Sequence, residues 1–86
     1  MQIRFTRHAK ERMEERGVTE EDVQRAIEFP DKIGRSVLSH ARYIVKKVYY
    51  NVSLGKKHLL MVIYEERNEG VLVITIIDTS KIDKYY

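Results

Sequence analysis

The spacing of apolar side chains divides the chain into a helical first part and a strand-rich second part. Between residues 7 and 29 the apolar residues recur three or four positions apart, which predicts amphipathic helices. After Pro30 they become dense, β-branched and aromatic, which indicates strands. Repeats, low-complexity tracts and linker-like segments are absent from the sequence. We therefore expect residues 1–86 to form one domain.

Polar residues mark where two helices begin and end. Thr6 is a good N-cap for a first helix that Gly17 would end, because glycine readily adopts the left-handed conformation. Thr19, with Asp22 three residues later, begins a second helix that runs to about Phe29. Its apolar stripe is expected to cover a sheet.

The remaining pattern predicts strands at residues 2–5, 36–50 (one strand or a bent pair), 58–66 and 71–79. The turn Arg67-Asn68-Glu69-Gly70 between the last two suggests a hairpin. The expected fold class is α+β, with two N-terminal helices packed on a three- to four-stranded antiparallel sheet.

Two features of these strands predict further structure. Residues 59–64 and 71–77 are apolar at nearly every position, so both faces of the sheet need cover. A partner, the chain's own tail or curvature of the sheet would each provide it. Lys46 and Lys47 are adjacent, so strict alternation would point one of them inward; we expect a β-bulge there or a cleft lined by a lysine.

Positive charge is concentrated in the middle of the chain. Residues 30–58 carry seven Lys or Arg against one Asp, whereas the whole chain has a net charge of only +3. Tyrosines are interspersed with these cations, a mixture suited to single-stranded nucleic acid. The candidate nucleic-acid-binding residues are Arg42, Lys46, Lys47, Tyr49, Tyr50, Lys56 and Lys57. The alternative is a solvated edge strand whose lysines prevent aggregation.

Composition argues against several classes of site. The chain has no cysteine, and His8, His40 and His58 share no metal-ligand spacing, so neither a metal nor a cofactor is expected. Glycine-rich phosphate loops and serine-nucleophile signatures are also missing. The N-terminus lacks an apolar signal region, and no apolar run approaches the roughly 20 residues that cross a bilayer. We expect a cytoplasmic protein without a membrane partner.

The first predicted helix places His8, Arg12 and Arg16 four residues apart. On a helical wheel of about 100° per residue, this stripe runs beside the apolar seam of Ala9 and Met13. Arginine forks bind phosphate well, and a histidine beside them is a plausible acid or base. The stripe therefore predicts the rim of an anion-binding cleft. The alternative is that His8 is an ordinary solvent-facing residue.

The run RHAKERMEERGVTEEDVQRAIEFPD, residues 7–31, resembles the signature of a small prokaryotic domain family of unknown function. Members begin with Arg-His-Ala-x-x-Arg-Met-x-x-Arg-Gly, a hydrophobic residue and Ser or Thr. That family is similar to the RelE/ParE and BrnT-type toxins of toxin–antitoxin systems. The C-terminal half of this chain is similar to the BrnT-type pattern of strands and a tail that ends in Tyr.

The resemblance implies a RelE/ParE-like fold and a metal-independent endoribonuclease, an mRNA interferase in which the ribose 2′-hydroxyl attacks its own phosphate. It implies that His8 is the acid or base and that Arg12 and Arg16 bind phosphate. BrnT-type tails are rich in arginine, whereas this tail offers only Lys81 and Tyr86 as substitutes.

Three functions are open at this point. The first is the endoribonuclease, with RNA as substrate and a cognate antitoxin protein as partner. The second is a non-catalytic RelE/ParE-like module that binds RNA or a protein target. The third makes the cationic stripe structural and forms a homodimer through the apolar face of the sheet.

Overall fold

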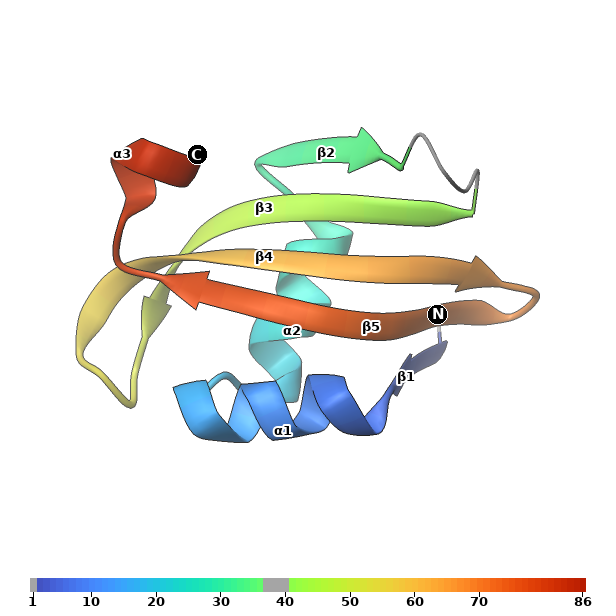
Figure 1. The fold of residues 1–86 in the computed structure, drawn as a ribbon, viewed down its shortest axis with the longest axis horizontal. Coiled ribbons are helices and arrows are strands. Elements are labelled where there is room, and N and C mark those ends of the chain that lie inside the picture. Colours follow the sequence, from blue (N-terminus) through green and yellow to red (C-terminus); the bar gives the residue numbers. More distant parts are fainter. Residues whose placement is uncertain (1, 37–40) are drawn as a thin grey trace.

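The computed structural model describes residues 2–36 and 41–86. Figure 1 shows the elements of this part of the chain. Along the sequence they are β1 (Gln2–Phe5), α1 (Arg7–Arg16), α2 (Glu20–Glu28), β2 (Lys32–Arg35), β3 (Arg42–Asn51), β4 (Lys56–Arg67), β5 (Gly70–Thr79) and the short α3 (Ile82–Tyr85).

The strands form one open sheet of five strands in the order β1-β5-β4-β3-β2. Strands β2 to β5 are antiparallel neighbours, whereas β1 pairs with β5 in parallel. α1 packs against β5 and β1, and α2 packs against β3 and β4. Figure 1 shows α2 behind the sheet, α1 along the β1 side and α3 near β2.

The predicted helix ends are confirmed. The hydroxyl oxygen of Thr6 accepts a hydrogen bond from the backbone N–H of Ala9 at 3.1 Å, and Gly17 ends α1 in the left-handed conformation with φ of 68°. Thr19 and Asp22 form a reciprocal capping box at the start of α2. The predicted first strand and the hairpin between β4 and β5 are also present.

A hydrophobic core lies between the two long helices and one face of the sheet. α2 contributes its predicted apolar stripe, and α1 contributes Ala9 and Met13. The sheet contributes side chains that alternate along three strands. The principal members from the sheet are Val45, Leu60, Val62, Val73 and Ile76.

The opposite face of the sheet is partly covered by the chain's own tail. Lys47 contacts the C-terminal end of α2 through the Phe29 carbonyl, whereas its neighbour Lys46 contacts the Tyr85 carbonyl of α3. Because successive strand residues point to opposite faces, α3 lies on the face away from α2. Leu59 is fully buried although it alternates away from the core residue Leu60. Of the three possible covers for these apolar strands, the chain's own tail therefore provides part of the cover on this face.

Two parts of the fold prediction were wrong. The sheet has five strands and is mixed, not three- to four-stranded and antiparallel. β2 was missed because all four of its residues are exposed, so it carries no burial pattern. The parallel pairing of β1 follows from contacts between the two ends of the chain, which local spacing does not encode. The strand expected over residues 36–50 is β3 alone in the described part; residues 37–40, with His40, lie outside it.

Of the two expectations for Lys46 and Lys47, the bulge is absent, whereas a cleft lined by a lysine is present, because Lys47 lines a cleft beside α2. The register between β3 and β4 runs without a break, and the irregularity of the sheet lies between Ile63 and Tyr64, where β4 pairs with β5. No bulge is needed, because each lysine side chain donates to a carbonyl oxygen at a helix end on its own face of the sheet.

Candidate active site

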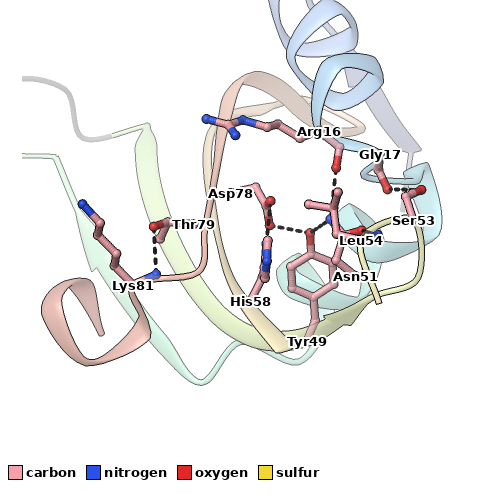
Figure 2. A network of polar contacts seen from close by, with 10 residues as sticks. All are labelled: Arg16, Gly17, Tyr49, Asn51, Ser53, Leu54, His58, Asp78, Thr79 and Lys81. Carbon is pink, nitrogen blue, oxygen red and sulfur yellow. Dashed lines mark hydrogen bonds and ion pairs between the residues drawn. The ribbon is translucent and has the colours of Figure 1, made fainter. Parts of the chain in front are cut away.

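A buried polar network lies where the end of α1 meets the hairpin between β3 and β4 (Figure 2). Its centre is the carboxylate of Asp78 in β5. Oδ1 of Asp78 accepts a hydrogen bond from the Tyr49 hydroxyl at 2.5 Å, and Oδ2 lies 2.8 Å from Nδ1 of His58. One carboxylate therefore holds a phenol and an imidazole at the same time.

The sheet register brings these three residues together. Tyr49 of β3 lies directly opposite His58 of β4, and Asp78 of β5 lies opposite Leu60, two residues further along β4. His58 and Leu60 point to the same face, because side chains alternate with a period of two. His58 and Asp78 are only 6% and 3% exposed, so the hydrogen bond between them is weakly screened by water.

Asn51 connects this network to α1. Its Nδ2 donates to the Tyr49 hydroxyl at 2.9 Å and to the backbone carbonyl of Arg16 at 3.0 Å. Its Oδ1 accepts from the backbone N–H of Leu54 at 3.0 Å, within the hairpin turn. The amide is fully buried and its bonds span three segments, so it fixes the position of the hairpin relative to α1.

The close approach of α1 to the hairpin also depends on Gly17. A Cβ atom at this position would lie 2.5 Å from the side chain of Ser53, and its φ of 68° is unfavourable for other residues. Two features therefore require glycine at position 17: the left-handed backbone that ends α1 and the close contact with Ser53.

The two nitrogens of His58 have different environments. An ionised carboxylate only accepts hydrogen bonds, so the contact with Asp78 places a proton on Nδ1. Nε2 has no hydrogen-bond partner among the described residues, and no buried side-chain nitrogen or oxygen in that part of the chain lacks one. Nε2 is therefore not fully buried, although the His58 side chain as a whole is only 7% exposed. A histidine held at Nδ1 by a carboxylate and open at Nε2 has the arrangement of a general acid or base.

Tyr49 is held in its protonated form. Burial of the ring, followed by the hydrogen bond and the negative charge of Asp78, raises the pKa of its phenol well above the ordinary value. The Tyr49 hydroxyl therefore donates a hydrogen bond to Asp78. Because the phenol stays protonated, it does not remove the proton from His58.

The residues predicted on α1 are placed in two different environments. His8 is exposed in the first turn, and no polar contact joins it to other described residues. Arg12 is about one-third exposed and lies 4.0 Å from Glu15. Arg16 bonds to the network through its carbonyl, and its side chain points toward the side of the network where Asp78 lies (Figure 2). His8 lies about two turns before Arg16 in α1, which is about 12 Å along the helix axis.

The predicted tail residues lie elsewhere. The backbone oxygen of Tyr86 accepts from Lys32 at 2.7 Å, beside β2, and the side chain of Lys81 points away from the network (Figure 2). α1 and α3 are at opposite sides of the sheet in Figure 1. The fold therefore does not bring the tail residues beside His8, Arg12 and Arg16.

The candidate nucleic-acid-binding residues are divided between the two faces of β3 and β4. Tyr49 and Lys47 point toward the helices, whereas Lys46 and Tyr50 point away from them. Arg42 pairs with Glu65 at 3.1 Å, and both lysines of β3 donate to carbonyl oxygens. Within the described chain, the exposed side chains with no polar partner among these candidates are Tyr50, Lys56 and Lys57.

His58, Asp78 and Asn51 were not among the predicted site residues, and Tyr49 was selected only for stacking. The sequence does carry a signal for two of them. His58 begins an apolar run that forms β4, and Asp78 ends the apolar run of β5. An ionisable residue that adjoins a buried strand needs a partner, which makes such a pair worth searching for.

Two negative findings concern the described residues alone. They contain no group of three or more His, Asp or Glu side chains arranged to hold a metal ion. None of their helices combines the length and apolar character that crossing a bilayer requires.

Comparison with known proteins identifies a family for this chain. No curated protein and no solved structure matches the chain. A family model described as a domain of unknown function covers residues 5–78, a range that includes Arg16, Tyr49, Asn51, His58 and Asp78 and excludes α3. The chain therefore belongs to the family described as domain of unknown function DUF4258.

Proposed function

We propose that this protein is an endoribonuclease that cleaves RNA without a metal ion, with His58 as its acid or base. The observation that carries the proposal is the pairing of Nδ1 of His58 with the buried Asp78 carboxylate, which leaves Nε2 without a hydrogen-bond partner among the described residues and not fully buried. This chemistry needs no cofactor, since the attacking group is the 2′-hydroxyl of the substrate.

In the proposed reaction, Nε2 of His58 removes the proton from the 2′-hydroxyl as its oxygen attacks the adjacent phosphorus. The bond between phosphorus and the 5′ oxygen breaks, and the departing oxygen takes up a proton from solvent water. The products are a 2′,3′-cyclic phosphate and a 5′-hydroxyl end. Asp78 stabilises the imidazolium that forms, and the hydrogen bond from Tyr49 holds the carboxylate in place.

Arg16 is the proposed cation for the negatively charged transition state. It lies in the last turn of α1, its side chain is exposed, and it forms no ion pair with the described residues. The backbone carbonyl of Arg16 accepts a hydrogen bond from Asn51, which fixes the backbone from which the guanidinium side chain extends. A planar guanidinium that approaches a phosphate can donate two hydrogen bonds to it. Arg12, one turn earlier, is the second candidate.

The order of one strand, two helices and four antiparallel strands is compatible with the RelE/ParE-like relationship that the motif of α1 implies. We carry this relationship as part of the proposal. It supports RNA as the substrate, while the assignment of the acid or base comes from the His58–Asp78 geometry.

The test is cleavage of a single-stranded RNA in the presence of EDTA by the wild type, His58→Ala and His8→Ala. General acid–base catalysis contributes about 100-fold or more, so we expect His58→Ala to lose at least that factor while His8→Ala stays active. Mass spectrometry of the wild-type products should show cyclic phosphate ends, and circular dichroism should show that both variants are folded.

Other outcomes separate the parts of the proposal. An inactive His8→Ala beside an active His58→Ala assigns the role to the histidine of the motif and removes it from His58. A folded wild type that leaves RNA intact refutes the nuclease.

A binding module is the second candidate function. The exposed side chains of Phe29 and Ile33, 68% and 59% accessible, lie at the end of α2 and on the edge strand β2. Apolar residues exposed beside an unpaired strand edge favour contact with another protein. Formation of a stable complex by a protein that does not cut RNA would favour this function.

A further inference from the structure

A cleft of about 520 Å³ opens beside the network, between α2 and the hairpin that joins β3 to β4. Tyr49 is shared between the two features, because its hydroxyl bonds to Asp78 while the residue also lines the cleft. A volume of this size is typical of sites for small molecules. The cleft therefore adjoins the network through Tyr49, while His58 and Asp78 lie outside its lining.

Both faces of β3 contribute to the cleft, because β2 pairs with β3 only as far as Lys46 and leaves the following residues as a free edge. The apolar lining includes Tyr50, Val52 and Leu60. Tyr50 is 58% exposed, so its ring is available for stacking. An aromatic ring with aliphatic neighbours suits a flat heterocycle.

The charges of the cleft do not suit a phosphate. Its two cations, Arg25 and Lys47, lie 2.6 Å from Glu21 and 3.6 Å from Asp31, and two carboxylates share the lining with them, so the cleft has no excess of positive charge. Glu21 and Asp22 line the cleft themselves and would repel an anion. Carboxylates accept hydrogen bonds, so the complementary ligand is a neutral ring that carries N–H donors.

We propose that this cleft binds a nucleobase, with guanine preferred, as the base subsite of the proposed ribonuclease. Guanine presents two neighbouring N–H groups on one edge, which match the two oxygens of a carboxylate. Glu21 is the proposed acceptor, because its side chain is 70% exposed and its surface pair with Arg25 costs little to rearrange. The other carboxylate, Asp22, already accepts from the Thr19 backbone in the capping box. The base would lie against Tyr50.

The base-site proposal rests on the proposed ribonuclease for its biological meaning. Its test does not depend on that activity, because it measures nucleoside binding without cleavage. Guanosine, adenosine, cytidine and inorganic phosphate are titrated separately into ¹⁵N-labelled protein, and amide shifts are followed by NMR. We expect guanosine to shift the resonances of Thr19, Tyr50 and Val52 at the lowest concentration. Glu21→Gln should bind guanosine about tenfold more weakly, since a hydrogen bond to a charged group is lost. Glu28→Gln, on the same helix but outside the lining of the cleft, is the matched control.

The proposal is overturned if phosphate shifts the same resonances as strongly as guanosine, if no nucleoside shifts them, or if Glu21→Gln and Glu28→Gln bind guanosine equally. These outcomes are independent of the nuclease. Guanosine bound in the cleft of a protein that does not cut RNA would refute catalysis and leave the base site, whereas cleavage without nucleoside binding would refute the base site alone.

Discussion

Replacing Asn51 with alanine tests whether the buried network determines the stability of the hairpin. The amide makes three hydrogen bonds, to the Tyr49 hydroxyl, the Arg16 carbonyl and the Leu54 N–H, and is fully buried. A hydrogen bond contributes about 1 kcal/mol net, so the variant should lose about 3 kcal/mol of unfolding free energy. Domains of this size have roughly 5–15 kcal/mol in total, so the loss is a large fraction of the stability.

The assay is urea denaturation followed by circular dichroism, with thermal melting as a second measure. At roughly 4–8 °C per kcal/mol for a domain of this length, the melting temperature should fall by roughly 12–24 °C. Asn68→Ala, an exposed asparagine in the turn between β4 and β5, is the matched control and should change stability by less than about 0.5 kcal/mol. A loss below about 1 kcal/mol in Asn51→Ala would refute the reasoning, because solvent would then be replacing bonds that the structure buries.

Two further predictions concern the same region. Gly17→Ala should destabilise the protein by about 1–3 kcal/mol, because φ of 68° and the Ser53 side chain both oppose a Cβ; Gly34→Ala, whose Cβ would meet an ordinary contact at 3.5 Å, is the control, and equal melting temperatures would contradict the prediction. The raised pKa of Tyr49 means that the folded state keeps a proton that the unfolded chain releases above about pH 10, so wild-type stability should fall as the pH rises from 10 to 11. Denaturation at pH 9 and 11 should show a smaller fall for Tyr49→Phe, and identical falls would rule out this source of pH dependence.

The helix ends were predictable because their signals are local. Thr6 bonds to a backbone group three residues away, and Thr19 and Asp22 bond to each other across one helical turn. The capping residues therefore lie within the same short stretch as the groups that they satisfy. The sheet was harder, because β2 is exposed at every position and gives no apolar alternation to detect.

The candidate site was the least predictable part. Tyr49, His58 and Asp78 come together only through the register of three strands, and Asp78 lies 20 residues from His58 along the chain. The motif of α1 directed attention to His8, although the part of that motif tied to the network is the carbonyl of Arg16. A backbone contact of this kind leaves no trace in the type of side chain, so spacing alone does not reveal it.

The parallel pairing of β1 with β5 also has a consequence for synthesis on the ribosome. Gln2 pairs with Gly70, and the Thr6 hydroxyl donates to the carbonyl of Ile74, 68 residues later. The first strand and the helix that follows it thus emerge long before the strand on which they pack. Contacts of such high sequence separation slow folding, and they leave the apolar side of α1 uncovered while the chain grows. The nascent protein completes its sheet only when β5 has left the exit tunnel.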